Sequence, residues 1–367
     1  MKYDVLITGA DGFLGKNLFH SIKNNENVKN IYRFCKNDNH RTLSSFIEKS
    51  DLIFHFAATN RSNNQKDFIK NNEDLTKLIC TYLIKTSSKK KLIFTSSIHS
   101  GNDSIYGQTK YNAENLIKET KSSPNLECVV YRLPGIFGKW AKPNYNSVVA
   151  TFCYNANNNL PLKVDDKDKS IKLMYIDDLV EEFINHLNIE ITDASVNFIQ
   201  TYDISLGKLA SQIEIFSSYK SIENLNDPLT KKLLSTYQSY KKPEDLSYKL
   251  KENRDDRGSF TEIINTKNSG QISFLTSKPG ITRGNHFHNT KFEKFLVLKG
   301  IASFKFRDLN TGECYEKITS FEIPEVVETS PGWVHDITNI GSDEIIVLAW
   351  ANENFDQHNP DTIPEVV

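Results

Sequence analysis

Short apolar runs alternate with helical stretches through the first two thirds of the chain. The runs lie at residues 3–8, 30–34, 51–56, 91–95 and 127–132. Apolar runs of this length are typical of strands that a sheet buries on both faces. Helical segments between them favour crossover connections from one strand to the next. The pattern therefore predicts an α/β fold with a doubly wound parallel sheet.

The pattern changes near residue 245. An amphipathic helix is expected after Asn226-Asp-Pro228, and Lys241-Lys-Pro-Glu then breaks the helical period. Short strands are expected beyond it, at residues 260–265, 271–276, 293–298, 301–306, 313–323 and 344–350. Such spacing predicts an all-β sandwich or barrel. A chain of 367 residues also favours two domains, which we place at 1–245 and 246–367.

Composition narrows the classes of partner. A net charge of −1 gives no reason to expect nucleic acid or an anionic membrane. No apolar run approaches ~20 residues, and the start MKYDVLITGADG is typical of a strand and a glycine turn rather than a signal peptide. Five cysteines without a CxxC pair indicate reduced thiols. We expect a cytoplasmic protein.

A glycine-rich turn follows the first strand. It runs from Thr8 to Gly15 as TGADGFLG and leads into a helix expected at Lys16–Ile22. Glycines let the backbone approach a pyrophosphate, and the helix N-terminus offers free N–H groups. Ala57 and Ala58 end the strand at 51–56, at the sheet edge where ligands bind. These features predict a dinucleotide site.

The strand at 30–34 bears on the choice of cofactor. Dinucleotide folds usually carry an acid near its end to bind the ribose 2′-hydroxyl. Arg33 stands in that region instead, and a guanidinium favours a 2′-phosphate. We expect NADPH rather than NADH, although a solvated arginine at a strand end remains an open alternative.

A catalytic set is indicated between residues 95 and 110. Tyr106 and Lys110 are four residues apart, so they share one face of a helix beginning near Tyr106. A phenol with a pKa of about 10 exchanges a proton more readily beside an ammonium and an oxidised nicotinamide. Ser97 ends a strand and can bind the reacting carbonyl oxygen. The alternative is an ordinary amphipathic helix start.

A set of metal ligands is indicated between Gly280 and Asn339. His286 and His288 are one residue apart and point the same way on an extended strand. Glu293 follows in a β-rich segment, and His335 offers a third imidazole. Three imidazoles and a carboxylate suit Zn, Mn, Fe or Ni. The alternative is a group of surface histidines on a β-hairpin.

The first part of the chain resembles the extended short-chain dehydrogenases/reductases, which have a Rossmann-like sheet. The resemblance rests on TGADGFLG, on Asn72-Glu-Asp-Leu-Thr, on Arg132-Leu-Pro134-Gly-Ile-Phe-Gly138, and on Ser97, Tyr106 and Lys110 as the catalytic set. It implies a set of residues that contact the cofactor: Thr8, Gly9, Asp11, Gly12, Phe13, Leu14, Gly15, Arg33, Ala57, Ala58, Tyr106, Lys110 and Pro134. Gly135 stands where the family usually has asparagine, and the interval from Ser97 to Tyr106 is shorter than usual.

The second part resembles the cupins, which are small β-barrels with a metal in the mouth. Residues 280–300 match the motif G-x5-H-x-H-x4-E-x6-G, and Gly332-x2-His335-x3-Asn339 is similar to the second cupin motif, with Pro331 displaced by one position. The resemblance implies that His286, His288, Glu293 and His335 hold a divalent metal, with zinc the expected ion. Cupin barrels often pair, so a homodimer is expected.

A reductase joined to a cupin resembles the capsular polysaccharide enzymes of the CapF type. The resemblance implies two reactions on a UDP-linked 2-acetamido-2,6-dideoxy-4-hexulose. The cupin would invert C3, and the reductase would convert the C4 ketone with NADPH to UDP-2-acetamido-2,6-dideoxy-L-talose. Lys294, Asp336 and His358 are candidates for the acid and base of the inversion.

Three alternatives stay open at this point. In the first alternative, the cupin is a non-catalytic sugar-binding or dimerisation module. A variant of this alternative is a cupin that epimerises without a metal. The N-terminal domain senses the cofactor without turnover in the second. The cupin is an Fe(II) oxygenase in the third, which oxygen consumption would reveal.

Overall fold

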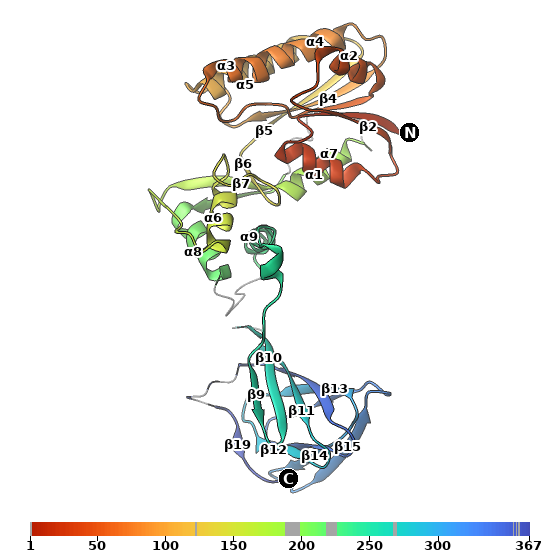
Figure 1. Cartoon of the computed structure of the whole chain (residues 1–367), viewed down its shortest axis with the longest axis vertical. Coiled ribbons are helices and arrows are strands. Elements are labelled where there is room, and N and C mark those ends of the chain that lie inside the picture. Colours follow the sequence, from red (N-terminus) through yellow and green to blue (C-terminus); the bar gives the residue numbers. More distant parts are fainter. Residues whose placement is uncertain are drawn as a thin grey trace. The chain divides into compact units, whose positions relative to one another are not determined.

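A computed structural model of the chain describes residues 2–121, 123–187, 199–217, 226–266, 270–354, 356, 358 and 360–367. These residues form two compact units (Figure 1). The first unit extends to Ser217 and includes Asp227–Lys241, and the second contains Lys242–Val367.

The first unit is built on a five-stranded parallel sheet in the order β2-β1-β3-β4-β5. Its strands are β1 (Tyr3–Thr8), β2 (Val28–Phe34), β3 (Leu52–His55), β4 (Lys90–Ser97) and β5 (Leu126–Leu133). Alternate residues of the strands pack on opposite faces, and both faces are covered, so the central strands have apolar centres, as in residues 5–7 and 92–94. The predicted doubly wound parallel sheet is confirmed.

Helices cover both faces of this sheet (Figure 1). One face packs against α1 (Phe13–Ile22) and α7 (Ile176–Asn185). The other packs against α2 (His40–Lys49), α4 (Leu75–Ile84) and α5 (Ile105–Thr120). The chain also forms α3 (Gln65–Phe68) and a π-helical turn, η1 (Ile69–Asp74), before α4.

A smaller subdomain completes the first unit. Its sheet has the order β6-β7-β8 and contains β6 (Gly135–Phe137), β7 (Ser170–Tyr175) and β8 (Thr201–Ser205). Its helices are α6 (Val148–Asn157), α8 (Leu206–Ser217) and α9 (Pro228–Gln238). Asp227 caps α9 as its sequence indicates, because its carboxylate accepts a hydrogen bond from the Thr230 N–H at 2.7 Å.

From the sequence, Asp177 and Asp178 are expected to be an N-cap and a first-turn acid of the helix that follows, and the N-cap interpretation is wrong. Tyr175 is the N-cap of α7, so Asp177 and Asp178 both lie in its first turn. Asp177 pairs with Lys139, and Asp178 lies 2.6 Å from the Lys232 ammonium. The two acids therefore tie α7 to neighbouring segments.

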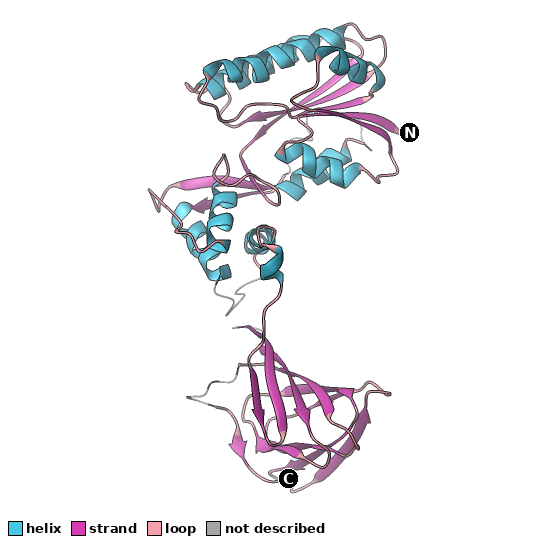
Figure 2. Cartoon of the chain, in the orientation of Figure 1, coloured by secondary structure: helices cyan, strands magenta, loops and turns pink. Residues whose placement is uncertain are grey.

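The second unit is built mainly of strands (Figure 2). One sheet has the order β16-β13-β18-β11-β10-β9 and the other β15-β14-β17-β12-β19. The strands are β9 (Glu252–Asp255), β10 (Gly258–Thr266), β11 (Gly270–Ser277), β12 (Thr282–Phe287), β13 (Glu293–Lys299), β14 (Ile301–Asp308), β15 (Cys314–Ser320), β16 (Val326–Glu328), β17 (Trp333–Asn339), β18 (Ile345–Ala351) and β19 (Ile363–Pro364). A 3-10 turn, η3 (Pro243–Leu246), precedes them.

The apolar side chains of the two sheets meet in one core. Phe295 and Val297 of β13, Phe304 and Phe306 of β14, and Ile337 of β17 belong to it. All six strands expected from the alternating pattern are present, although β15 ends three residues before the predicted limit.

β12 carries an irregularity that positions the histidines. Its register against β17 shifts between Gly284 and His286, and Asn285 has φ 59°. Gly284 has φ 98°, and a Cβ there would lie 2.8 Å from the His335 carbonyl oxygen. Only glycine fits this crossing without strain. Among the described residues, no helix has the length and apolarity needed to cross a bilayer.

Candidate nucleotide and metal sites

A cavity of about 1190 Å³ opens at the carboxyl ends of β1, β2 and β3. Its walls come from the turn after β1, the segment Phe34–His40, the segment Phe56–Thr59, and residues between 64 and 75. Parallel α/β sheets bind ligands at this edge, where connections leave toward opposite faces. The cavity therefore lies where the sequence predicts a dinucleotide.

Several predicted cofactor contacts line this cavity. They are Gly9, Gly12, Ala57 and Ala58. Gly9 has φ 67°, and a Cβ there would lie 2.8 Å from the Ala57 nitrogen, so the turn needs glycine. Phe13, Leu14 and Gly15 form the first turn of α1 beside it.

Thr8 fixes the start of the glycine-rich turn through hydrogen bonds of its side chain. Its hydroxyl lies 2.8 Å from Nδ1 of the fully buried His55 and accepts a bond from the Ala57 N–H at 3.3 Å. The other ring nitrogen of His55 lies 2.9 Å from the Thr76 hydroxyl. Burial lowers the pKa of His55 to about 3, so the ring is neutral. Its two hydrogen bonds link β3 to β1 and to α4.

Arg33 and Asp11 lie together outside the cavity lining. Arg33 donates to the Asp11 carboxylate at 2.6 Å and lies over the Phe19 ring at 4.7 Å. Lys36, two residues after the end of β2, and His40, the first residue of α2, line the cavity instead. Neither was predicted from the sequence. The position of Lys36 just past the strand end is the signal that would have found it.

The predicted catalytic residues come from two elements, with Ser97 at the end of β4 and Tyr106 and Lys110 in the first turns of α5. α5 begins at Ile105, and Ser104 caps it through a bond from the Gly107 N–H at 3.0 Å. Burial raises the pKa of the Tyr106 phenol, and a hydrogen bond with Ser97 partly opposes this. The phenol is therefore protonated at neutral pH and can serve as a proton donor.

Lys110 lies one turn further along α5. Its ammonium is buried, donates to the Thr95 carbonyl at 2.7 Å, and lies 4.6 Å from the centroid of the Phe94 ring. Burial lowers the pKa of Lys110 to about 7, although Glu114 acts to raise it. The Thr95 carbonyl thus holds Lys110 beside β4, the strand that also carries Ser97.

The remaining predicted features lie around the same edge. Pro134 follows β5, and Gly135 begins β6. Tyr145, from the polar loop after β6, lines the cavity. Its carbonyl accepts from Arg61 at 2.7 Å, and its hydroxyl donates to the Arg61 carbonyl at 3.2 Å. The loop is therefore fixed to the segment after β3.

A cluster of metal-binding groups lies inside the second unit. One ligand atom from each of His286, His288, Glu293 and His335 can be chosen so that all four lie within 4.8 Å of one another. His286 comes from β12, His288 directly follows that strand, Glu293 begins β13, and His335 lies on β17. All four predicted ligands converge, and His288 and His335 are buried.

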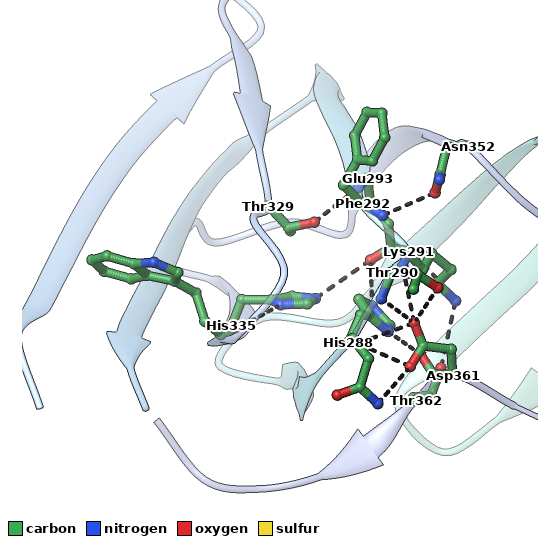
Figure 3. A network of polar contacts seen from close by, with 12 residues as sticks. His288, Thr290, Lys291, Phe292, Glu293, Thr329, His335, Asn352, Asp361 and Thr362 are labelled. Atoms are coloured by element: carbon green, nitrogen blue, oxygen red, sulfur yellow. Dashed lines mark hydrogen bonds and ion pairs between the residues drawn. The ribbon is translucent and has the colours of Figure 1, made fainter. Parts of the chain in front are cut away.

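Hydrogen bonds from Nδ1 of His288 and from Nδ1 of His335 define the orientation of these two rings. Nδ1 of His288 donates to the Asp361 carbonyl, and Nδ1 of His335 donates to the Trp333 carbonyl at 3.4 Å. A carbonyl oxygen only accepts, so in each neutral ring Nε2 is left as an acceptor. Each Nε2 lies 3.4 Å from Oε2 of Glu293 (Figure 3). In the neutral form of these rings, which is the form that binds a metal, two nitrogen lone pairs therefore face the Glu293 carboxylate.

The donor set fits a divalent cation. Two ligands held about 2.1 Å from one tetrahedral ion are about 3.4 Å apart. Nε2 of His335 is buried and makes no hydrogen bond within the described part of the chain. Burial, with His335 and His288 nearby, lowers the pKa of His286 to about 4. Burial acts to raise the pKa of Glu293, but His288 and His335 outweigh it and leave it well below its ordinary range.

The acid and base candidates from the sequence do not share this centre. Lys294 follows Glu293 and Asp336 follows His335, so each points to the opposite face of its strand. Lys294 pairs with Glu328, and His358 is exposed. Lys291, which the sequence analysis missed, is buried with its ammonium 4.0 Å from Glu293 Oε1.

Comparisons with known proteins agree with both halves of this description. Residues 5–188 match the NAD dependent epimerase/dehydratase family, and residues 253–363 match the polysaccharide biosynthesis C-terminal domain. The crystal structure of the capsular polysaccharide assembling protein CapF from Staphylococcus aureus is 36% identical, with a TM-score of 0.92 over 99% of this chain and 100% of that one. This chain belongs to the CapF-like capsular polysaccharide proteins.

Two further relatives extend the comparison. A Pseudomonas aeruginosa protein named UDP-2-acetamido-2,6-beta-L-arabino-hexul-4-ose reductase is 41% identical over 362 residues, 98% of this chain and 97% of that protein. A structure of CapF with the inhibitor 3-isopropenyl-tropolone is 34% identical, with a TM-score of 0.86 over 99% of both chains. The CapF-like architecture therefore spans essentially the whole chain.

Proposed function

We propose that this CapF-like protein is a bifunctional enzyme of capsular polysaccharide precursor synthesis. Its substrate is UDP-2-acetamido-2,6-dideoxy-4-hexulose. The second unit inverts C3, and the first unit reduces the C4 ketone with NADPH to give UDP-2-acetamido-2,6-dideoxy-L-talose. The P. aeruginosa relative, named as a hexul-4-ose reductase, supports the substrate class and the reduction.

The reduction is supported by the groups at the end of β4. Bound NADPH would supply the hydride to C4. The Tyr106 phenol, kept protonated by burial, gives its proton to the developing alkoxide, and Ser97 orients the oxygen. Lys110 is held by the Thr95 carbonyl one turn along the same helix face, where it can favour the phenolate that remains.

The epimerisation is supported by the four-residue cluster, which is the single observation that carries the bifunctional proposal. The hydrogen on C3 is acidic because the C4 carbonyl can accept the resulting charge as an enolate. A bound divalent cation, with zinc our expectation from the donor set, stabilises that charge. The three imidazoles and Glu293 hold the ion, and their single negative charge leaves the centre net positive.

Cofactor preference belongs to the same proposal. The cavity wall after β2 carries Lys36 and His40, and Arg33 lies on the strand itself. The Lys36 ammonium at this point favours the 2′-phosphate of NADPH. We also expect a homodimer in the cytoplasm, by analogy with other cupins and from the reduced cysteines of the sequence.

One incubation tests both reactions. The 4-keto UDP-sugar, NADPH and wild-type protein are combined in deuterated water, and positions 3 and 4 of the product are read by NMR. The proposal expects solvent deuterium at C3 and protium from NADPH at C4. Reduction without deuterium at C3 would leave a reductase joined to a non-catalytic cupin. Oxygen uptake during turnover would instead indicate an oxygenase.

A further inference from the structure

The segment Asp361–Val367 packs along the metal cluster. β19 pairs antiparallel with β12, so that Pro364 lies opposite His286 and Ile363 opposite Phe287. The Glu365 N–H donates to the Asn285 carbonyl at 3.0 Å. The segment is thus an edge strand beside the two histidines of the HxH motif.

Arg307 fastens the end of this segment to the barrel. Its guanidinium donates to the Glu365 carboxylate at 2.8 Å and to the Val366 carbonyl at 2.5 Å. Arg307 lies on β14, next to Phe306, which pairs with His335 in register. The C-terminal segment is therefore attached to β12, which carries His286, and to β14, the neighbour of the strand that carries His335.

The Asp361 carboxylate organises the loop between His288 and Glu293. It accepts backbone N–H bonds from Asn289 at 2.9 and 3.0 Å, from Thr290 at 2.7 Å and from Lys291 at 2.9 Å. It also accepts from the Asn289 amide and the Thr290 hydroxyl, each at 3.1 Å (Figure 3). Three consecutive N–H groups converging on one carboxylate fix the path of the loop.

The main chain of Asp361 acts on His288 itself. Its carbonyl accepts the bond from Nδ1 that leaves Nε2 as an acceptor facing Glu293. Thr362, the next residue, lies 3.4 Å from the Lys291 ammonium, which in turn lies 4.0 Å from Glu293. Two adjacent residues of the segment thus contact one ligand directly and a second ligand through Lys291.

Glu293 is held from the opposite side by other segments. Its N–H donates to the Thr329 hydroxyl at 2.8 Å, and the Phe292 N–H donates to the Asn352 side chain at 2.9 Å. These contacts fix the far end of the loop, and at its near end Asp361 acts together with the Gly332 N–H, which donates to the His288 carbonyl at 2.9 Å.

We propose that Asp361 is a positioning residue of the metal centre, which sets the ring of His288 and the loop that spaces it from Glu293. This inference rests on the metal site of the proposed function. Groups that hold the second nitrogen of a metal-binding histidine commonly change metal affinity by 10- to 100-fold. Asp361 supplies that group and fixes the adjoining backbone as well.

The test compares Zn²⁺ affinity in the full-length protein, measured by competition with a chelator. Asp361→Asn keeps the size of the side chain and the backbone carbonyl that accepts from His288, but it turns an amide group toward N–H donors. The carbonyl and the loop then lose their fixed position, so we expect affinity to fall by roughly 10- to 100-fold, as when an outer partner is displaced. Glu365→Gln is the matched control, since it removes a carboxylate from the same segment. It should change affinity by less than about threefold, because Arg307 still holds the Val366 carbonyl.

A second readout separates positioning from general stability. Co²⁺ replaces Zn²⁺, and its visible absorption reports the geometry of the ligands. Asp361→Asn should alter the spectrum of the saturated protein, whereas Glu365→Gln should reproduce that of the wild type. If Asp361→Asn lowers the yield of folded protein, Thr290→Val replaces it. This variant removes one hydroxyl donor to Asp361 and should weaken binding by about threefold.

The outcomes are distinct. Wild-type affinity and spectrum in folded Asp361→Asn would overturn the role of Asp361 and leave the metal site standing. Failure of the wild-type protein itself to bind Zn²⁺ or Co²⁺ would overturn the metal site, and with it the proposed epimerisation.

Discussion

Nε2 of His335 lies 3.4 Å from Oε2 of Glu293, and the other nitrogen of the same ring donates to the Trp333 carbonyl. In the neutral, metal-binding form of this ring two acceptor atoms face each other inside the barrel, as they do between His288 and Glu293. Such an arrangement is stable when a cation lies between them. At the end of β4, by contrast, burial keeps a phenol protonated. The two units thus offer two different chemistries.

Replacing His288 should disable only the metal centre. His288→Ala removes one of four ligands, so we expect Zn²⁺ affinity to fall by more than about 100-fold, beyond the loss typical of an outer partner. Deuterium exchange at C3 should be lost with the metal, while NADPH binding to the first unit is unchanged. His358→Ala, which changes an exposed histidine, is the matched control. Retained metal in folded His288→Ala would contradict the ligand assignment.

Replacing Tyr106 should disable only the reductase. Tyr106→Phe removes the phenolic proton donor, so NADPH oxidation should slow by roughly two to four orders of magnitude. Binding of NADPH, followed by its fluorescence, should stay within about twofold, since the ring itself is kept. Tyr111→Phe, at an exposed tyrosine of the same helix, should react like the wild type. Normal turnover in Tyr106→Phe would exclude it as the donor.

Lys110 should make stability depend on pH. Its pKa is about 7 in the folded protein against 10.5 ordinarily. Between these values the unfolded chain holds a proton that the folded chain lacks, so the contribution of Lys110 to the free energy of unfolding rises with pH. Its destabilising effect is complete below pH 7 and disappears as pH approaches 10.5.

Lys110→Met measures this effect by difference. The variant should gain most relative to the wild type at pH 7 and progressively less toward pH 10, in denaturant titrations of the full chain. The lost bond to the Thr95 carbonyl lowers its stability equally at all pH values. Lys118→Met, at an exposed lysine of the same helix, should show no such trend. A difference that does not vary with pH would contradict the lowered pKa.

Cofactor choice should depend on Lys36 more than on Arg33. Lys36 lines the cavity, whereas the charge of Arg33 is already paired with Asp11. Lys36→Met should weaken NADPH binding by about tenfold and leave NADH binding nearly unchanged, because only NADPH carries the 2′-phosphate. Arg33→Met should change both by less than about threefold. Both affinities are measured by titration calorimetry. If Arg33→Met weakens NADPH binding more than Lys36→Met does, Arg33 rather than Lys36 binds the 2′-phosphate.

The sequence predicted the fold well because each unit repeats one strong pattern. Strands buried on both faces have continuous apolar centres, as in residues 5–7, and the alternating strands of the second unit indicate a sheet with one buried face. Helix limits were predicted less well. Asp177 is typical of an N-cap residue, but α7 begins at Ile176 because β7 runs directly into it.

The site residues separate in the same way. His286, His288, Glu293 and His335 were predicted because ligand chemistry shows in residue type and spacing. Asp361 was missed because its role depends on a contact across 70 residues of chain. Lys294 was a reasonable candidate by proximity in sequence, but strand alternation turns it away from Glu293.

Deuterium exchange at C3 in the Tyr106→Phe protein tests the central claim most directly. The 4-keto UDP-sugar is incubated in deuterated water without NADPH, with a protein-free sample as the background. We predict exchange with the zinc-loaded protein, background exchange after chelation, and recovery when Zn²⁺ is returned. Exchange that continues at the same enzymatic rate in metal-free protein would contradict a metal-dependent epimerase in the barrel.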